Sequence, residues 1–194
     1  GSEMCIRDSS RTDEYGGSFE GRMRIGIEII KRIKKACGED YPIIYKFTPT
    51  HLIKGGREIE EGIKMAEYLQ DAGVTALHVD IGCHACWHNA IPTIYQEPAI
   101  HEKYIKLIKE TVNIPVIGHG KLGYPEVAER ILQDGVSDFI ALGHYSLADP
   151  EWANKVKENR EEEIVPCIGC NECMLSVLSG NPVSCGVNPL CGRE

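Results

Sequence analysis

Four cysteines near the carboxyl terminus have the spacing of a loop that wraps an iron–sulfur cluster. They follow the pattern Cys167-x2-Cys170-x2-Cys173-x11-Cys185. Cysteine thiolates are the usual ligands of such clusters, and three of them within one turn supply three corners of a cube. Zinc is the main rival, although structural zinc sites usually combine two separated cysteine pairs, and a disulfide framework is the third interpretation. The spacing favours a 4Fe-4S cluster bound by these four residues.

Two glycine-bearing turns form a second group of candidate residues. The segments IPVIGHGKL and DFIALGHYSLADP each place a glycine directly after a short apolar strand and before a helix. Glycine lets the backbone approach a phosphate, and the following helix offers unpaired N–H groups at its amino terminus. One such turn carries little weight, but two in succession predict a phosphate site within residues 118–121 and 143–144.

Lys46 is a charged residue in an otherwise apolar strand, which we predict over residues 42–48. Strands of parallel sheets are normally covered on both faces, and a buried charge is costly unless it meets an anion or strong acceptors. Lys46 is therefore a candidate for binding an anionic group. The alternative is that the alternation of the strand turns its side chain to solvent.

The loop over residues 82–98 carries two histidines, His84 and His88, beside Cys83, Cys86 and Trp87. One of the histidines could donate a proton near neutral pH. A zinc site made of both cysteines and both histidines is an alternative with cramped spacing, and an exposed structural loop is another. The remaining histidines have no comparable surroundings, and we interpret them as structural: His51, His78, His101 and His119.

These candidates lie at strand ends in a chain that alternates helices and strands. Helices are predicted over residues 19–37, 58–72, 100–112, 125–134 and 150–158, and strands over 42–48, 76–81, 114–117 and 138–142. Such alternation is typical of a parallel sheet covered by helices. No GxGxxG follows the first strand, which argues against a dinucleotide-binding open sheet. Functional residues beyond the carboxyl ends of strands favour part of a (β/α)8 barrel.

Composition excludes several classes of function. The 194 residues carry a net charge of −8 without a stripe of Lys and Arg, so nucleic acid is a poor partner. No run approaches the ~20 apolar residues of a membrane span. The nine cysteines are clustered rather than spread as a framework, which predicts a reducing, cytoplasmic location. Residues 1–10, with the string MCIRDS, resemble translated adapter sequence, and we expect them to be a non-native leader.

Five segments, in this order along the chain, resemble the iron–sulfur branch of the old yellow enzyme (NADH:flavin oxidoreductase) family, which includes dienoyl-CoA and enoate reductases. They are RTDEYGGSFEGRMR (Arg11–Arg24), WHNAIPTI (Trp87–Ile94), LADPEW (Leu147–Trp152), PCIGCNEC (Pro166–Cys173) and CGVNPLCGRE (Cys185–Glu194). The resemblance implies an α/β fold: the C-terminal half of a TIM (β/α)8 barrel that binds FMN over residues 11–160, followed by a cysteine-rich iron–sulfur loop over 161–194. The missing half-barrel and a downstream domain for FAD and NAD(P)H would complete the protein.

The resemblance also implies roles for single residues. Lys46 would lie against the flavin, where a positive charge stabilises the anionic reduced ring. Gly120, Lys121 and Gly143 would bind the FMN phosphate, beside His144 where the family usually has arginine, and an imidazole is a weaker phosphate partner. His88 is the best match to the family's active-site histidine, and His84 is its competitor. Cys191 would be a bystander to the cluster.

The function implied is that of an NAD(P)H-dependent flavin oxidoreductase that reduces an activated C=C bond of the enoate or dienoyl-CoA type. Electrons would pass from NAD(P)H through FAD, the cluster and FMN to a small-molecule substrate. Two alternatives are amine oxidation in the manner of trimethylamine dehydrogenase, and a zinc-stabilised binding module without a redox role. As an isolated piece the chain is expected to be inactive, and to be unstable or a homo-oligomer because parallel sheet edges are exposed.

Overall fold

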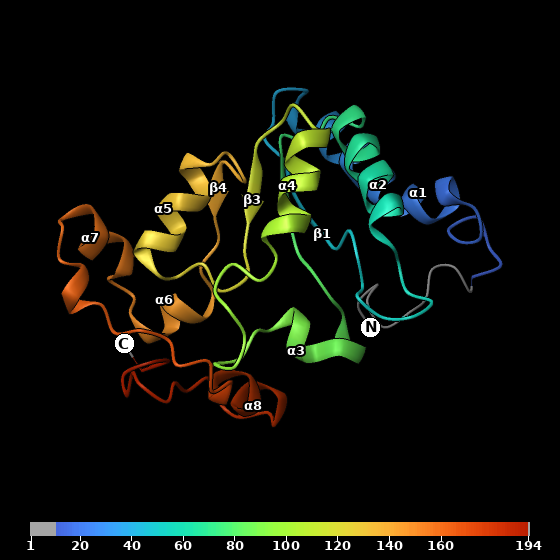
Figure 1. The fold of residues 1–194 in the computed structure, drawn as a ribbon. Helices are drawn as coiled ribbons and strands as arrows, with labels where there is room; N and C mark the ends of the chain where they lie inside the picture. Colours follow the sequence, from blue (N-terminus) through green and yellow to red (C-terminus); the bar gives the residue numbers. More distant parts are fainter. Residues whose placement is uncertain (1–10, 194) are drawn as a thin grey trace.

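The computed structural model describes residues 11–193 as one parallel sheet with helices packed along it (Figure 1). The strands are β1 (Ile44–Phe47), β2 (Ala76–Val79), β3 (Val116–Gly118) and β4 (Phe139–Ile140). All neighbours are parallel and the order is β1-β2-β3-β4, so each strand pairs with the next along the chain. This sequential order is that of a barrel segment, and the α/β prediction is confirmed. The predicted non-native leader lies outside the described residues.

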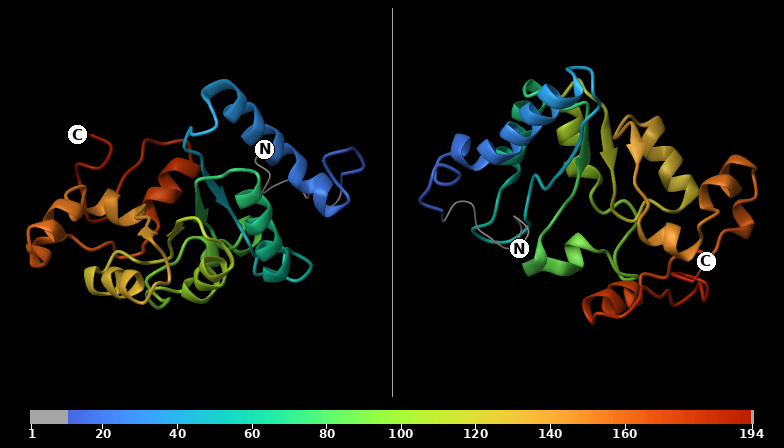
Figure 2. Two further views of the ribbon diagram at one scale, coloured as in Figure 1. Left: turned by 90° about the horizontal axis from the view of Figure 1, so that it is seen from above. Right: turned by 180° about the vertical axis from the view of Figure 1, so that it is seen from behind.

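Four helices cover the outer face of the sheet: α1 (Phe19–Cys37), α2 (Ile59–Asp71), α4 (Glu102–Thr111) and α5 (Pro125–Gln133) (Figure 2). Local sequence sets their ends. The Ser18 hydroxyl accepts a hydrogen bond from the Gly21 N–H at 3.1 Å and caps α1, which stops at Gly38 with φ at 102°. Pro125 occupies the first turn of α5, where its missing N–H costs nothing.

The two faces of the sheet differ in burial. Leu77, Val79 and Val116 point toward the helices and are fully buried in the main core. The register pairs Lys46 with His78 and His78 with Ile117, so a second row of side chains faces the other way. On that inner face Ile44 and Phe139 are 63% and 58% exposed. In a closed barrel this face is covered by side chains of the remaining strands, so the described residues form part of a TIM barrel.

The helix predicted over residues 150–158 is shorter in the structure than in the prediction, and a second short helix, which was not predicted, precedes it. Helix α6 (His144–Ala148) ends at Asp149, and α7 (Trp152–Lys157) follows. Asp149 is 4% exposed; its carboxylate contacts Lys155 Nζ at 2.7 Å and accepts from the Val165 N–H at 2.9 Å. This buried ion pair fixes the start of the cysteine segment against the barrel.

The remaining short elements lie at the carboxyl ends of the strands or beyond them. They are the 3-10 turns η2 (His84–Cys86) and η3 (Glu161–Glu163) and the helices α3 (Trp87–Ala90) and α8 (Glu172–Leu178). Helix α8 starts inside the cysteine motif and contains Cys173, and Cys185 follows after its end. Among the helices of residues 11–193, none has the length and apolar character of a bilayer-spanning segment.

His101, at the start of α4, is a buried polar residue of this core. It is 1% exposed, its Nε2 lies 2.8 Å from the Asn89 carbonyl oxygen, and burial lowers its pKa to about 4. The pKa of His101 is lower in the folded chain than in the unfolded chain, so between these two pKa values a proton binds the unfolded chain more tightly. The free energy of unfolding therefore decreases as pH falls from about 6.5 toward 4.

We expect the free energy of unfolding of the His101→Gln variant to depend less on pH than that of the parent chain. Between pH 6.5 and 4.5 the parent should lose about 2 kcal/mol more than the variant, because each pKa unit is worth about 1.4 kcal/mol. Urea denaturation at several pH values measures this slope, and the fixed cost of the substitution cancels in the comparison. His88→Gln, at an exposed position, is the control, and equal slopes for His101→Gln and the parent would contradict the assignment.

Candidate functional site

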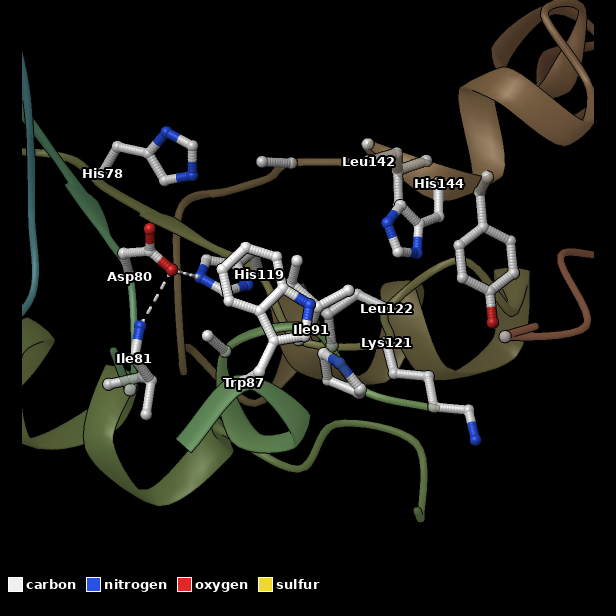
Figure 3. Close-up of a pocket in the computed structure, with 18 of the residues that line it drawn as sticks. His78, Asp80, Ile81, Trp87, Ile91, His119, Lys121, Leu122, Leu142 and His144 are labelled. Atoms are coloured by element: carbon white, nitrogen blue, oxygen red, sulfur yellow. Dashed lines mark hydrogen bonds and ion pairs between the residues drawn. The ribbon is translucent and has the colours of Figure 1, made fainter. Parts of the chain in front are cut away.

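A cavity of ≈ 380 Å³ opens at the carboxyl ends of the strands (Figure 3). Its volume is within the range of small-molecule sites, which bind their ligands mostly by apolar contacts and a few polar groups. The apolar part of its wall includes Ile81, Trp87, Ile91, Leu122 and Leu142. Its polar and turn residues are Lys46, His78, Asp80, Cys83, His84, His119, Gly120, Lys121, Gly143, His144 and Cys167.

Asp80 contacts two of the other polar side chains of the cavity wall. Its Oδ1 lies 2.6 Å from His119 Nε2, and its Oδ2 lies 2.9 Å from Lys46 Nζ. Burial alone would raise the pKa of Asp80, but the hydrogen bonds and charges of His119 and Lys46 lower it below its ordinary value. The carboxylate is therefore ionised, and it holds one cationic and one imidazole group at the cavity.

Lys46 is neither buried in the core nor simply directed to bulk solvent. Its side chain is 57% exposed, because it projects from the inner face of β1 into the cavity, where Asp80 pairs with it. The two alternatives for Lys46 were an anionic partner and a side chain directed to solvent, and the structure combines them. Lys46 lies at the cavity, partly exposed, and its anionic partner is Asp80 of the protein itself.

Two histidines that sequence reasoning treated as structural belong to the site. The rings of His78 and His119 meet edge to face with centroids 5.9 Å apart, and both line the cavity. Burial, assisted by the charges of Lys46 and His119, lowers the pKa of His78 to about 4, so this ring is neutral at pH 7. The sequence contained a signal for both residues: Asp80 lies near the carboxyl end of the strand predicted over 76–81, and His119 lies two residues beyond the strand predicted over 114–117, where barrel sites collect.

The two candidate catalytic histidines differ in position. His84 lines the cavity, and its ring lies 4.7 Å from the Trp87 ring, centroid to centroid. His88 is exposed on α3 and is not among the residues that line this cavity, although its carbonyl accepts a hydrogen bond from Gln96 Nε2 at 2.8 Å. The geometry brings His84, and not His88, to the wall of the cavity.

The two glycine turns reach the cavity as predicted, but Lys121 has other partners than a phosphate. Its ammonium donates to the carbonyl oxygens of Thr93 and Ile94 at 3.1 and 3.2 Å, and also to that of Gln96. Burial lowers the pKa of His144, so this imidazole is neutral at pH 7. The polar groups left for an anion at this end are mainly those of the backbone around Gly120 and Gly143.

Gly120 and Gly143 are required or tolerated at this end of the cavity for different reasons. Gly120 has φ at +114°, and a Cβ there would lie 2.5 Å from His101 Nδ1, so only glycine fits against the packed ring. A Cβ built on Gly143 meets no atom within 4 Å, because its position faces open space. The backbone is therefore open to a ligand at Gly143, whereas Gly120 is needed for packing against His101.

The cysteine segment packs against the same cavity. Cys167 and Gly169 line it, and a Cβ on Gly169 would lie 2.6 Å from the Ile94 nitrogen, within the loop that Lys121 binds. Burial raises the pKa of Cys173, and the charges of Cys167, Cys185 and Cys170 raise it further, because the four sulfur atoms gather in one region. The predicted ligand set thus lies beside the cavity.

The zinc alternative for residues 83–88 finds no support in the geometry. Cys83 and Cys86 are adjacent, with their sulfur atoms 3.7 Å apart, but within residues 11–193 no three His, Cys, Asp or Glu side chains are placed to hold one metal ion. A cubic cluster makes a different demand, because each of its cysteines binds a separate iron atom. The described cysteines form no disulfide with one another, so the third interpretation of the motif is also unsupported.

Comparisons with known proteins identify the family to which the chain belongs. The sequence profile of the NADH:flavin oxidoreductase / NADH oxidase family matches residues 6–163. The chain is 44% identical to "NADH oxidase" of Thermoanaerobacter brockii, covering 100% of this chain and 30% of that protein. It is 38% identical to "Cinnamate reductase" of Clostridium sporogenes, covering 95% and 30%. A solved structure of 2-naphthoyl-CoA reductase with 2-naphthoyl-CoA superposes with a TM-score of 0.89 at 33% identity, covering 95% of this chain and 28% of that one.

The chain spans about 30% of the length of these curated relatives. The family match over residues 6–163 includes the four strands and both glycine turns. This chain belongs to the NADH:flavin oxidoreductase / NADH oxidase family.

Proposed function

We propose that this chain provides the FMN site and the iron–sulfur ligands of an oxidoreductase that reduces an activated C=C bond with electrons from NAD(P)H. One observation carries the proposal: the cavity that fits a flavin and the four-cysteine segment share a wall, at Cys167 and Gly169. Electron transfer between two centres requires that they lie close together. The relatives named for cinnamate and 2-naphthoyl-CoA reduction favour a conjugated acid or thioester as substrate.

The residues of the cavity fit FMN. Trp87, Ile81 and Leu122 offer an apolar and aromatic wall for a flat ring, and Lys46 offers a cation at one end. The open backbone at Gly143 and the neighbouring turn at Gly120 offer room and N–H groups for a phosphate at the other end. When bound, FMN supplies hydride transfer, which the protein side chains cannot perform.

The thiols of the cysteine segment fit a 4Fe-4S cluster by their chemistry and number. Cys167, Cys170, Cys173 and Cys185 provide four sulfur ligands, of which Cys170 is exposed and the other three are partly buried. Lys121 lies close enough to Cys167 to lower its pKa, opposing the effect of burial. The loop of residues 93–96, which Lys121 binds, thereby joins the cluster segment to the FMN cavity.

The side chains of the cavity would stabilise charge on the reduced ring and supply a proton to the substrate. Lys46 would stabilise negative charge on the reduced ring, and Asp80 would hold the ammonium in place. His84, at the cavity wall, is the better placed of the two candidate histidines to give a proton to the substrate. FAD and NAD(P)H would bind parts of the whole protein beyond this chain.

A single-turnover assay on the full-length protein tests the reaction class. We expect anaerobically reduced, FMN-loaded protein to be reoxidised by a cinnamate-type acid or its thioester, as read from flavin absorbance. In the amine-oxidising alternative, the oxidised flavin would instead be bleached by a secondary or tertiary amine. Bleaching by the amine without reoxidation by the unsaturated acid would overturn the proposal.

The Lys46→Met variant should lower the midpoint potential of bound FMN. Removing the cation destabilises the anionic reduced ring. A tenfold decrease in the equilibrium constant for reduction of bound FMN corresponds to about 30 mV for a two-electron couple. Spectroelectrochemical titration of the FMN-loaded protein measures the shift. Lys31→Met, on the exposed face of α1, is the matched control and should leave the potential unchanged. A potential equal to that of the parent in Lys46→Met would remove Lys46 from the flavin site.

Replacement of any one cluster ligand should prevent stable cluster assembly. After anaerobic reconstitution with iron and sulfide we expect about four iron atoms per parent chain, and a large loss in Cys170→Ala or Cys173→Ala. Iron and sulfide analysis with the visible spectrum measures the content. Cys37→Ala, at an exposed position on α1, is the control. Stoichiometric zinc in a colourless parent protein would instead support the structural-zinc alternative.

A further inference from the structure

The turn that opens the cavity loop contains a pair of cysteines that the proposed function does not use. Cys83 and Cys86 bracket η2, and their sulfur atoms lie 3.7 Å apart. Both side chains are buried, at 9% and 4% exposure, but Cys83 lines the cavity and Cys86 does not. A dithiol with this C-x-x-C spacing is typical of redox-active sites, provided that one sulfur is reachable.

The turn places the two thiols next to each other. The 3-10 turn brings positions three apart onto the same side, and the two sulfur atoms lie 3.7 Å apart. The Cys83 N–H donates to Cys86 Sγ at 3.2 Å, and Cys86 Sγ donates to the His51 carbonyl oxygen at 3.0 Å. These bonds hold Cys86 next to Cys83, and the sulfur atoms need to approach by less than about 2 Å to form the S–S bond of ~2.05 Å.

We propose that Cys83 and Cys86 form a redox-active dithiol at the wall of the cavity, which small-molecule disulfides oxidise to an intramolecular disulfide. Cys83, as its thiolate, attacks one sulfur of the incoming disulfide, forming a mixed disulfide and releasing one thiolate. Cys86 then attacks Cys83 Sγ, forming the Cys83–Cys86 bond and releasing the second thiolate. Two electrons pass to the incoming disulfide, and the two protons of the pair end on the two released thiols.

The assignment of the two roles follows from position. Only Cys83 is reached from the cavity, so it meets the incoming molecule. Burial raises the pKa of Cys86, which keeps it a thiol until the mixed disulfide forms next to it. Closing the ring removes the S–H that donates to His51 and covalently fixes the turn that carries His84.

Thiol mapping tests the proposal directly. The reduced chain is equilibrated anaerobically with graded ratios of oxidised to reduced glutathione, quenched in acid, unfolded and labelled with N-ethylmaleimide. The peptide containing Cys83 and Cys86 should lose two hydrogens and take no label. Half-oxidation should need a ratio at least about tenfold lower than for any other cysteine pair. Full labelling of both residues at every ratio, or pairing of Cys83 with another cysteine, would overturn it.

Single substitutions separate the two roles. In Cys86→Ser, Cys83 should stop at the mixed disulfide, detected as a glutathione adduct. In Cys83→Ser, Cys86 should stay unmodified, because the cavity does not reach it. Cys37→Ser should leave the Cys83–Cys86 disulfide unchanged, since Cys37 is exposed on α1. An adduct on Cys86 in the Cys83→Ser variant would contradict the roles, and if a variant fails to fold, the parent mapping decides alone.

Discussion

The carboxylate of Asp80 is the interaction on which the polar side of the site depends. Asp80 lies directly after β2, and its carboxylate contacts Lys46 of β1 and His119 of the turn after β3. One residue therefore connects three strands. This arrangement requires the observed register, in which Lys46 pairs with His78. A shift of one residue would turn Lys46 into the apolar core, where an unpaired charge is costly.

A second buried carboxylate, Asp149, connects the barrel to the cysteine segment. It binds Lys155 and the Val165 N–H, which directs the chain back toward the cavity, two residues before Cys167. Asn188 Nδ2 adds a hydrogen bond of 2.9 Å to the Leu147 carbonyl, so both ends of the segment are attached near α6. Together with the carbonyl contacts of Lys121, these interactions explain why the cysteines lie beside the cavity and not on a separate lobe.

The sequence predicted the fold well because βα alternation and strand-end placement follow from short-range patterns. It also identified Lys46 and the glycine turns. It missed Asp80, His78 and His119, because their role arises from register between strands that lie 30 or more residues apart in the sequence. The partners of Lys121 were missed for a similar reason: a lysine next to a phosphate-like turn looks the same whether it binds an anion or a distant loop. The division of residues 144–157 into two helices depends on the tertiary contacts of Asp149.

The contacts of Lys121 and Lys46 determine which charged groups remain available at each end of the cavity. At the phosphate end, Lys121 is engaged by three carbonyls and His144 is neutral at pH 7, so no side-chain cation is available there from these two residues. In the proposed site, backbone N–H groups would then carry most of the recognition of the phosphate, and their charge does not change with pH. At the ring end, the ammonium of Lys46 is held by an ionised carboxylate. In the proposed FMN site, the side-chain charge of this chain would therefore lie at the ring end of the cavity, and it would act more on the redox potential of the flavin than on its retention.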